Sequence, residues 1–191
     1  MGEGQGEGQV SPILQAVAAF FERHDWPVDH FDDDDGALGT DTDTGGDRVT
    51  ITSFTGQHGT WPLVVAVVGV DLSHLVVHSI VPPVAPAGDE VAVLELLSRM
   101  NDGLVDGCFE LDFDNGTIRL RSAVPLRALS ALDVPTLTNL VGEVIIANVA
   151  TADRFIPAIE AVIDHAVPPA IAVASVEAGL DPRPADAGAD V

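Results

Sequence analysis

Two histidines and one aspartate come nearest to the spacing of a metal site. His74 and His78 lie four positions apart on a predicted strand, with Asp71 just before them, and imidazole and carboxylate groups bind divalent metals. Residues four apart on a strand are separated by about 13 Å, which is too far for both rings to reach one ion. We therefore expect no metal here, and we assign the two histidines to a polar or dimer-facing surface.

A second candidate for ion binding is the acidic loop over residues 32–47. Asp41, Asp43 and Gly46 match three positions of a calcium-binding loop, but Thr52 stands where the bidentate glutamate is needed. The run of aspartates at 32–35 has the pattern of a solvated charge run, which gathers cations only loosely. The loop therefore predicts no specific calcium site.

Nucleophilic chemistry has little support in the residue types. Cys108 is the only thiol, so neither an intramolecular disulfide nor a cysteine-based zinc site can form. Its alternation with Phe109 favours a partly buried strand position. The sequence has no G-x-S-x-G motif, and without lysine it has neither a Walker A loop nor a Schiff-base residue. We expect no catalytic residue, no cofactor and no enzymatic activity.

The charge of the chain argues against two classes of partner. The formal net charge is -22 over 191 residues, and all 8 basic residues are arginine. Nucleic acids and anionic lipids are bound mainly by neutralising their charges, so neither is an expected partner. An acidic, lysine-free composition is typical of proteins from a salty cytoplasm, and the alternative is an acidic protein from a GC-rich genome. The first interpretation predicts that salt stabilises the fold by screening repulsion between carboxylates.

Hydrophobic periodicity predicts one α+β domain. The pattern predicts an antiparallel sheet with packed helices, in the order α-βββ-α-ββ-α(α). The predicted elements are a helix at 11–25, a possible short strand at 28–31, strands at 48–55, 61–70 and 73–81, a helix from an Asp89 cap to Gly103, a hairpin at 108–124, and helices up to about 177. We place the domain at 11–178, between disordered segments at 1–10 and 179–191.

One predicted strand is apolar on both faces. Residues 63–68 read Leu-Val-Val-Ala-Val-Val, which favours a central strand covered on each side by helices or by a partner subunit. This excess of apolar residues predicts a homodimer. No apolar run reaches the roughly 18 residues that a membrane span requires. The start of the chain lacks the basic and apolar segments of a secretory signal, so we expect a cytoplasmic protein.

The hairpin has the clearest local signal. Asn115-Gly116 is the preferred pair for a two-residue turn, and the runs on either side alternate in polarity. The predicted register pairs apolar residues on one face and opposite charges on the other: Phe113 with Ile118, Leu111 with Leu120, Asp112 with Arg119, and Glu110 with Arg121. Further on, two apolar stripes predict two helices separated at 151–153, with Pro157 kinking or restarting the second.

Short strings in this order of elements resemble a known family. They are S-R-M-N-D-G-L at 98–104, G-C-F-E-L-D-F at 107–113, G-T-I-R at 116–119 and A-N-V-A-T-A-D-R-F-I-P at 147–157. Together they resemble the YbjN family, over roughly residues 11–177. The resemblance implies a fold like that of the type III secretion chaperones, a regulatory or chaperone-like role, and a dimeric interaction module without agreed catalytic residues.

Two classes of function remain open at this point. The first is a protein-interaction module, either chaperone-like or a regulatory adaptor, with a protein partner that the sequence does not identify. The second is a small-ligand or metal-binding domain, with hydrolytic activity as one form of it, which would use the His74 and His78 face or the acidic loop at 32–47. A large apolar contact surface favours the first class, and an enclosed cavity with converging polar groups favours the second.

Overall fold

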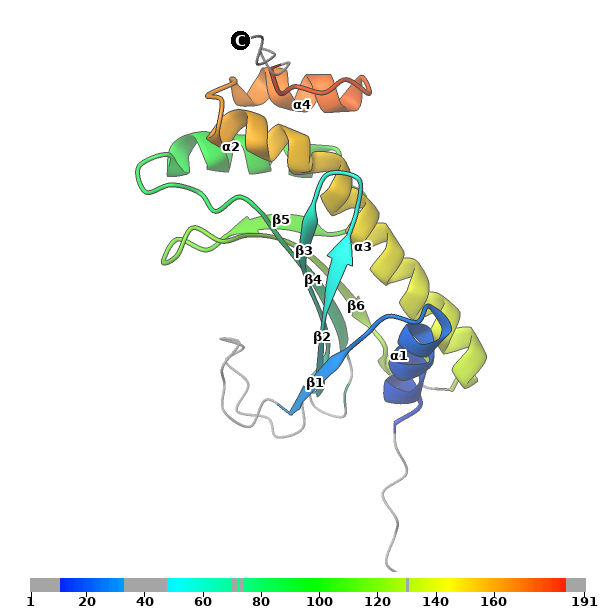
Figure 1. Ribbon diagram of the computed structural model, residues 1–191. Helices are drawn as coiled ribbons and strands as arrows, with labels where there is room; N and C mark the ends of the chain where they lie inside the picture. Colours follow the sequence, from blue (N-terminus) through cyan, green and yellow to red (C-terminus); the bar gives the residue numbers. More distant parts are fainter. Residues whose placement is uncertain (1–10, 33–47, 70–71, 73, 130, 185–191) are drawn as a thin grey trace, which may run out of the picture.

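A computed structural model describes residues 11–32, 48–69, 72, 74–129 and 131–184. One six-stranded antiparallel sheet has the strand order β1-β2-β3-β4-β6-β5. Figure 1 shows the helices on one side of this sheet. In chain order the elements are α1 Pro12–Arg23, β1 Asp29–Asp32, β2 Arg48–Thr55, β3 Thr60–Val68, β4 His74–Val81, α2 Glu90–Asp102, β5 Cys108–Leu111, β6 Ile118–Pro125, the 3-10 turn Arg127–Leu129, α3 Val134–Ile163 and α4 Pro169–Glu177. The predicted α+β class and the order of elements are confirmed, and the possible first strand is β1.

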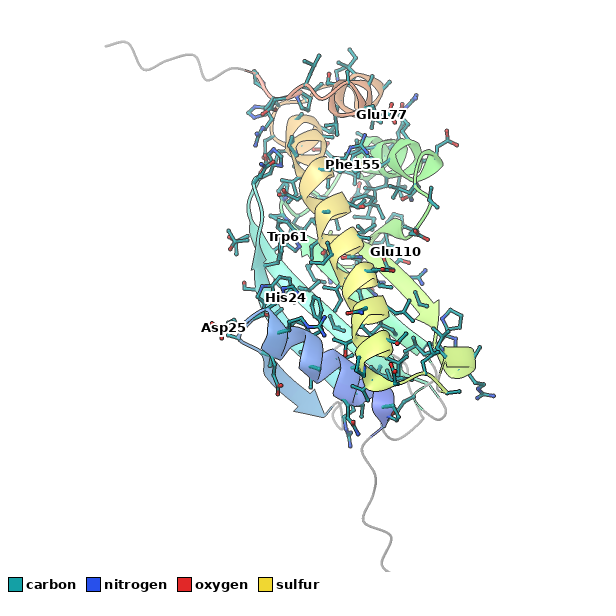
Figure 2. The ribbon with its side chains drawn as sticks, turned by 90° about the vertical axis from the view of Figure 1, so that its right-hand side faces the viewer. His24, Asp25, Trp61, Glu110, Phe155 and Glu177 are labelled. Carbon is teal, nitrogen blue, oxygen red and sulfur yellow. The ribbon has the colours of Figure 1, made fainter. Side chains whose placement is uncertain are left out.

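The main core lies between the sheet and the helices. Alternate residues of each strand point toward α3, as Leu63 and Val65 of β3 and Val77 of β4 do, and all three are buried. Figure 2 shows α3 crossing in front of the sheet. The two layers bury their apolar faces against each other, which is the main source of stability in such an arrangement.

The long helix α3 differs from the prediction. Residues Val134–Ile163 form one continuous helix that includes Pro157, so the expected separation into two helices at 151–153 is wrong. A proline in a helix removes one N–H, which leaves the carbonyl four residues earlier without its usual donor. That carbonyl belongs to Asp153, and the His58 ring nitrogen Nδ1 lies 3.0 Å from it. A contact from outside the helix thus compensates for the proline.

By length and composition, α3 is also the described helix that could cross a membrane. Its buried side chains explain why a core helix has this composition. Leu137, Ile145, Phe155 and Ile159 are almost fully buried against the sheet and the other helices. These four apolar residues of α3, which could face lipid in a membrane helix, here belong to the protein's own core.

The hairpin between β5 and β6 has a longer loop than predicted. Leu111 lies opposite Ile118, and the Asp112 N–H donates to the Thr117 carbonyl at 2.9 Å, so residues 113–116 form the loop. The predicted pairings of Phe113 with Ile118 and of Leu111 with Leu120 are therefore wrong, and Leu120 lies opposite Phe109. The Asp112 carboxylate accepts the Asp114 N–H at 2.9 Å and the Asn115 amide at 3.0 Å. These local hydrogen bonds favour a wider turn, as is common for aspartate and asparagine in loops.

Candidate functional site

One face of the sheet carries none of the helices that the described residues form. Residues that point to this helix-free face include Val64 and Ala66 of β3, Val76 of β4 and Ala123 of β6, as the strand registers require. A small hydrophobic cluster lies here, and it consists of strand residues only: Val49, Val64 and Ala66 with Ile51 and Val68 packed against them. The apolar run expected at 63–68 is therefore divided between this cluster and the main core.

The helix-free face is poor in carboxylates. Among the outward-facing residues of β2 to β6, all of which the structure describes, Glu110 is the only acidic one. The whole chain has 30 acidic residues. Over β2 to β6 of this face, two strongly acidic chains can therefore approach each other with little repulsion between carboxylates.

Glu110 lies between two arginines on this face. Its carboxylate accepts the Arg119 Nε–H at 2.9 Å and the Arg121 Nε–H at 2.6 Å. Burial alone would raise the pKa of Glu110, but the hydrogen bonds from both arginines hold it below its ordinary value. Two cations share one anion, so this cluster has a net positive charge in an otherwise acidic protein. Arg119 was expected to pair with Asp112 but pairs with Glu110, because the longer loop shifts the register by two residues.

His78 lies opposite Arg121 on the neighbouring strand. Its Nε2 atom is buried and has no hydrogen-bond partner. Burial lowers the pKa of His78 to about 4, and the positive charge of Arg119 contributes to the same shift. The ring is therefore neutral at pH 7. His74 and His78 share this face of β4, and the described residues contain no group of three or more side chains that could hold a metal ion. Asp71 lies outside the described residues, as do Asp41 and Asp43, which match two positions of a calcium-binding loop.

The pKa of His78 predicts a specific loss of stability in acid. Below pH 6.5 the unfolded chain protonates this ring, whereas the folded chain does not until about pH 4, so the folded state loses stability as the pH falls through that range. A pKa difference of one unit between the folded and unfolded chain corresponds to about 1.4 kcal/mol of stability. Because solvent screens a partly exposed ring, we expect the free energy of unfolding to fall by about 1–2 kcal/mol. We expect the difference in unfolding free energy between wild type and His78→Leu to be constant above pH 7 and to change between pH 6.5 and 4. An NMR titration in which the folded ring has a pKa near 6.5 would contradict this.

Asn101 closes the outer edge of β5. This strand is the last of the sheet, so one side of its backbone has no neighbouring strand. The Phe109 N–H donates to the Asn101 Oδ1 at 2.7 Å, and the Asn101 Nδ2 donates to the Phe109 carbonyl at 3.0 Å. The side-chain amide thus takes the place of a paired strand residue and protects the edge against pairing with other chains. Cys108, next to Phe109, is partly buried on β5, as the alternation predicts.

Asn148 connects α3 to the middle of the sheet. Its Oδ1 accepts the Ser79 hydroxyl at 2.7 Å, and its Nδ2 donates to the Ser122 hydroxyl at 2.9 Å and to the Leu120 carbonyl at 3.2 Å. The side chain is almost fully buried. A buried amide with all these partners fixes the position of the helix over β4 and β6, because a polar group left unpaired in this place is costly.

Asp153 holds the β2–β3 turn against α3. Its carboxylate accepts the Gln57 N–H at 3.0 Å and the His58 N–H at 2.9 Å. A Cβ atom on Gly56 would lie 2.6 Å from the Asp153 carboxyl carbon, so the close approach requires glycine there. A cleft of about 490 Å³ lies beside this junction, lined by His58, Asp153 and Arg154 among others. Its Asp153 carboxylate is already engaged by the turn, which indicates a structural role.

Asn101, Asn148 and Asp153 all lie in the strings quoted above. A family model for YbjN, described as "Putative bacterial sensory transduction regulator", matches residues 14–161. The chain belongs to the YbjN family. No match was found among the curated proteins. The matched region of this YbjN chain contains Asn101, Asn148 and Asp153.

The family resemblance of this YbjN chain rests partly on strings that contain Asn101, Asn148 and Asp153, but the sequence alone predicted no role for these residues. For Asn148 the sequence does contain a signal of a buried polar contact, because this polar residue lies between Ile145 and Val149 on the apolar face of the helix. The Glu110 cluster was predicted in part. Glu110 was placed on the correct face of the hairpin, and Arg121 was correctly predicted as one of its two arginine partners. The second arginine, Arg119, was assigned to Asp112 because the loop length was underestimated.

Proposed function

We propose that the chain is a non-catalytic regulatory module that acts by binding protein, and that a second copy packs on the helix-free face. The observation that supports this is the hydrophobic cluster on a face where β2 to β6 carry one carboxylate, in a chain whose net charge is -22. Apolar burial drives association, and scarcity of like charges permits it. The family description as a regulator supports the regulatory class.

The proposal extends to the mode of action, the location and the partners of the module. The module works as an adaptor or in a chaperone-like way, in the cytoplasm, with protein partners and without nucleic acid or membrane. A ligand-binding or metal-binding role has no specific observation in its favour in the described part of the chain, where no three metal-ligating side chains gather. The His74 and His78 face is better explained as part of the interaction surface.

The variant Val76→Arg tests the homodimer. Val76 lies between Ala66 and Ala123, so a larger side chain has room in one chain but projects into the place of a second copy. In sedimentation at about 1 M sodium chloride, which screens carboxylate repulsion, we expect a wild-type dimer and a Val76→Arg monomer. At about 1 M salt, repulsion between the new arginine and the nearby Glu110 cluster is largely screened, so the bulk of the side chain is the expected cause of the dissociation.

Ile146→Arg provides the matched control, because it makes the same charge change at an exposed position of α3 and should leave the dimer intact. A monomeric wild type, or a dimeric Val76→Arg chain, would refute the proposed interface. Co-purification from native lysate tests the protein-binding role separately. There a stoichiometric protein partner is expected, and a chain that retains only small molecules would contradict the proposed function.

A further inference from the structure

Three exposed apolar side chains lie in and next to loops at one end of the molecule. Phe113 in the hairpin loop is 67% exposed, Val84 in the β4–α2 loop is 56% exposed, and Val91 in the first turn of α2 is 80% exposed. Figure 1 shows the β4–α2 loop beside the β5–β6 hairpin at this end. The three residues, called the end patch here, are too exposed to contribute much to the core.

Hydrogen bonds hold the end patch in a fixed shape. The Ala85 N–H donates to the Gly116 carbonyl at 2.8 Å, which joins the loop before α2 to the hairpin loop. A Cβ atom on Gly116 would lie 3.0 Å from the Val84 Cγ1, so the two loops are in close contact. The Gly88 N–H donates to the Glu90 carboxylate at 2.9 Å and closes the turn into α2. A surface that is ordered before binding loses less entropy when a partner binds.

Four carboxylates lie close in sequence to the residues of the end patch. They are Asp89, Glu90, Asp112 and Asp114, each within one or two positions in sequence of one of the three apolar residues or of its loop. Within the described residues none of them forms an ion pair with an arginine: their hydrogen bonds go to backbone N–H groups or to the Asn115 amide. A group of apolar side chains among unpaired carboxylates is complementary to a segment that has both apolar and basic residues.

We propose that the end patch binds a protein segment in which arginine or lysine alternates with apolar residues. This proposal rests on the proposed role as a protein-binding module and adds a second surface with a defined partner chemistry. The apolar residues of the segment would cover Phe113, Val84 and Val91, and its cations would face the four carboxylates. A second copy of this chain is excluded as occupant, because a two-fold contact would bring like carboxylates together. An anionic membrane is repelled for the same reason.

A displayed library of random peptides of about 12 residues provides the test. The library is selected in parallel on wild type, on Phe113→Ser and on Val105→Ser, at about 0.15 M salt. Val105 is 96% exposed and lies in a different loop, so its substitution is the matched control. We expect peptides with basic and apolar residues to be enriched on wild type and on Val105→Ser and to be lost from Phe113→Ser. The best of them should bind Phe113→Ser at least about tenfold more weakly.

Three results would overturn this inference. The first is an equal set of peptides on wild type and Phe113→Ser, and the second is a Phe113-dependent set that is acidic or uncharged. The third is Phe113-dependent binding to phosphatidylcholine vesicles without peptide selection, which would make the patch a membrane contact. Thermal melts of both variants check that the fold is intact. Each of these results leaves the dimer test with Val76→Arg unaffected, so the two proposals can fail independently.

Discussion

Replacing Asn148 with leucine is expected to lower the free energy of unfolding by about 3 kcal/mol. The leucine fills a similar volume, so the loss comes from the partners of the amide: the Ser79 hydroxyl, the Ser122 hydroxyl and the Leu120 carbonyl. These groups are buried with the amide, and water does not replace it there. Urea denaturation at pH 7 measures the change.

A second pair of variants separates this polar network from simple packing. Asn139→Leu on the same helix removes only the exposed hydrogen bond from Arg23 and should change stability by less than about 0.5 kcal/mol. In a background with Ser79→Ala and Ser122→Ala, Asn148→Leu should cost about 1 kcal/mol less than in wild type, because fewer partners remain to be orphaned. Equal costs in both backgrounds would show that the amide does not act through the two hydroxyls.

The strands could be predicted from sequence because their alternation is local. Residues 48–55 form β2 with the predicted bounds, and β4 ends at Val81 as predicted, while the predicted first residue, 73, lies outside the described residues. In the hairpin, the error in loop length moved the register by two positions, and a shift of two keeps every side chain on its face. That is why Glu110 and Arg121 were placed on the correct face although Phe113 was expected opposite Ile118 and is in fact exposed.

The polar contacts could not be predicted because they join residues far apart in the chain. Asn148 meets Ser79 across 69 positions, and Asp153 meets His58 across 95 positions. No periodicity indicates which turn will meet which helix. A second contact between His58 and Asp153, from the imidazole ring to the backbone carbonyl, also explains why α3 is continuous. A proline predicts a break when only the helix is considered, and the His58 ring lies within hydrogen-bonding distance of the carbonyl that Pro157 leaves free.

Gly56→Ala is expected to destabilise the fold by about 2 kcal/mol through overpacking at this junction. The new methyl group would meet the Asp153 carboxylate, which cannot turn aside without losing the hydrogen bonds from the Gln57 and His58 N–H groups. Gly103→Ala is the control, because its Cβ would have an ordinary contact of 3.7 Å with the Glu177 carboxylate and should leave stability nearly unchanged.

The decisive measurement for the junction is the same glycine substitution in an Asp153→Ala background. Asp153→Ala alone should cost about 1–2 kcal/mol, since two backbone N–H groups lose their acceptor and only partly regain one from water. Once the carboxylate is gone, the alanine at position 56 has space, so Gly56→Ala should then cost less than about 0.5 kcal/mol. A cost that stays near 2 kcal/mol without the carboxylate would place the conflict in the backbone of the turn, and Asp153 would not be the reason that this position requires glycine.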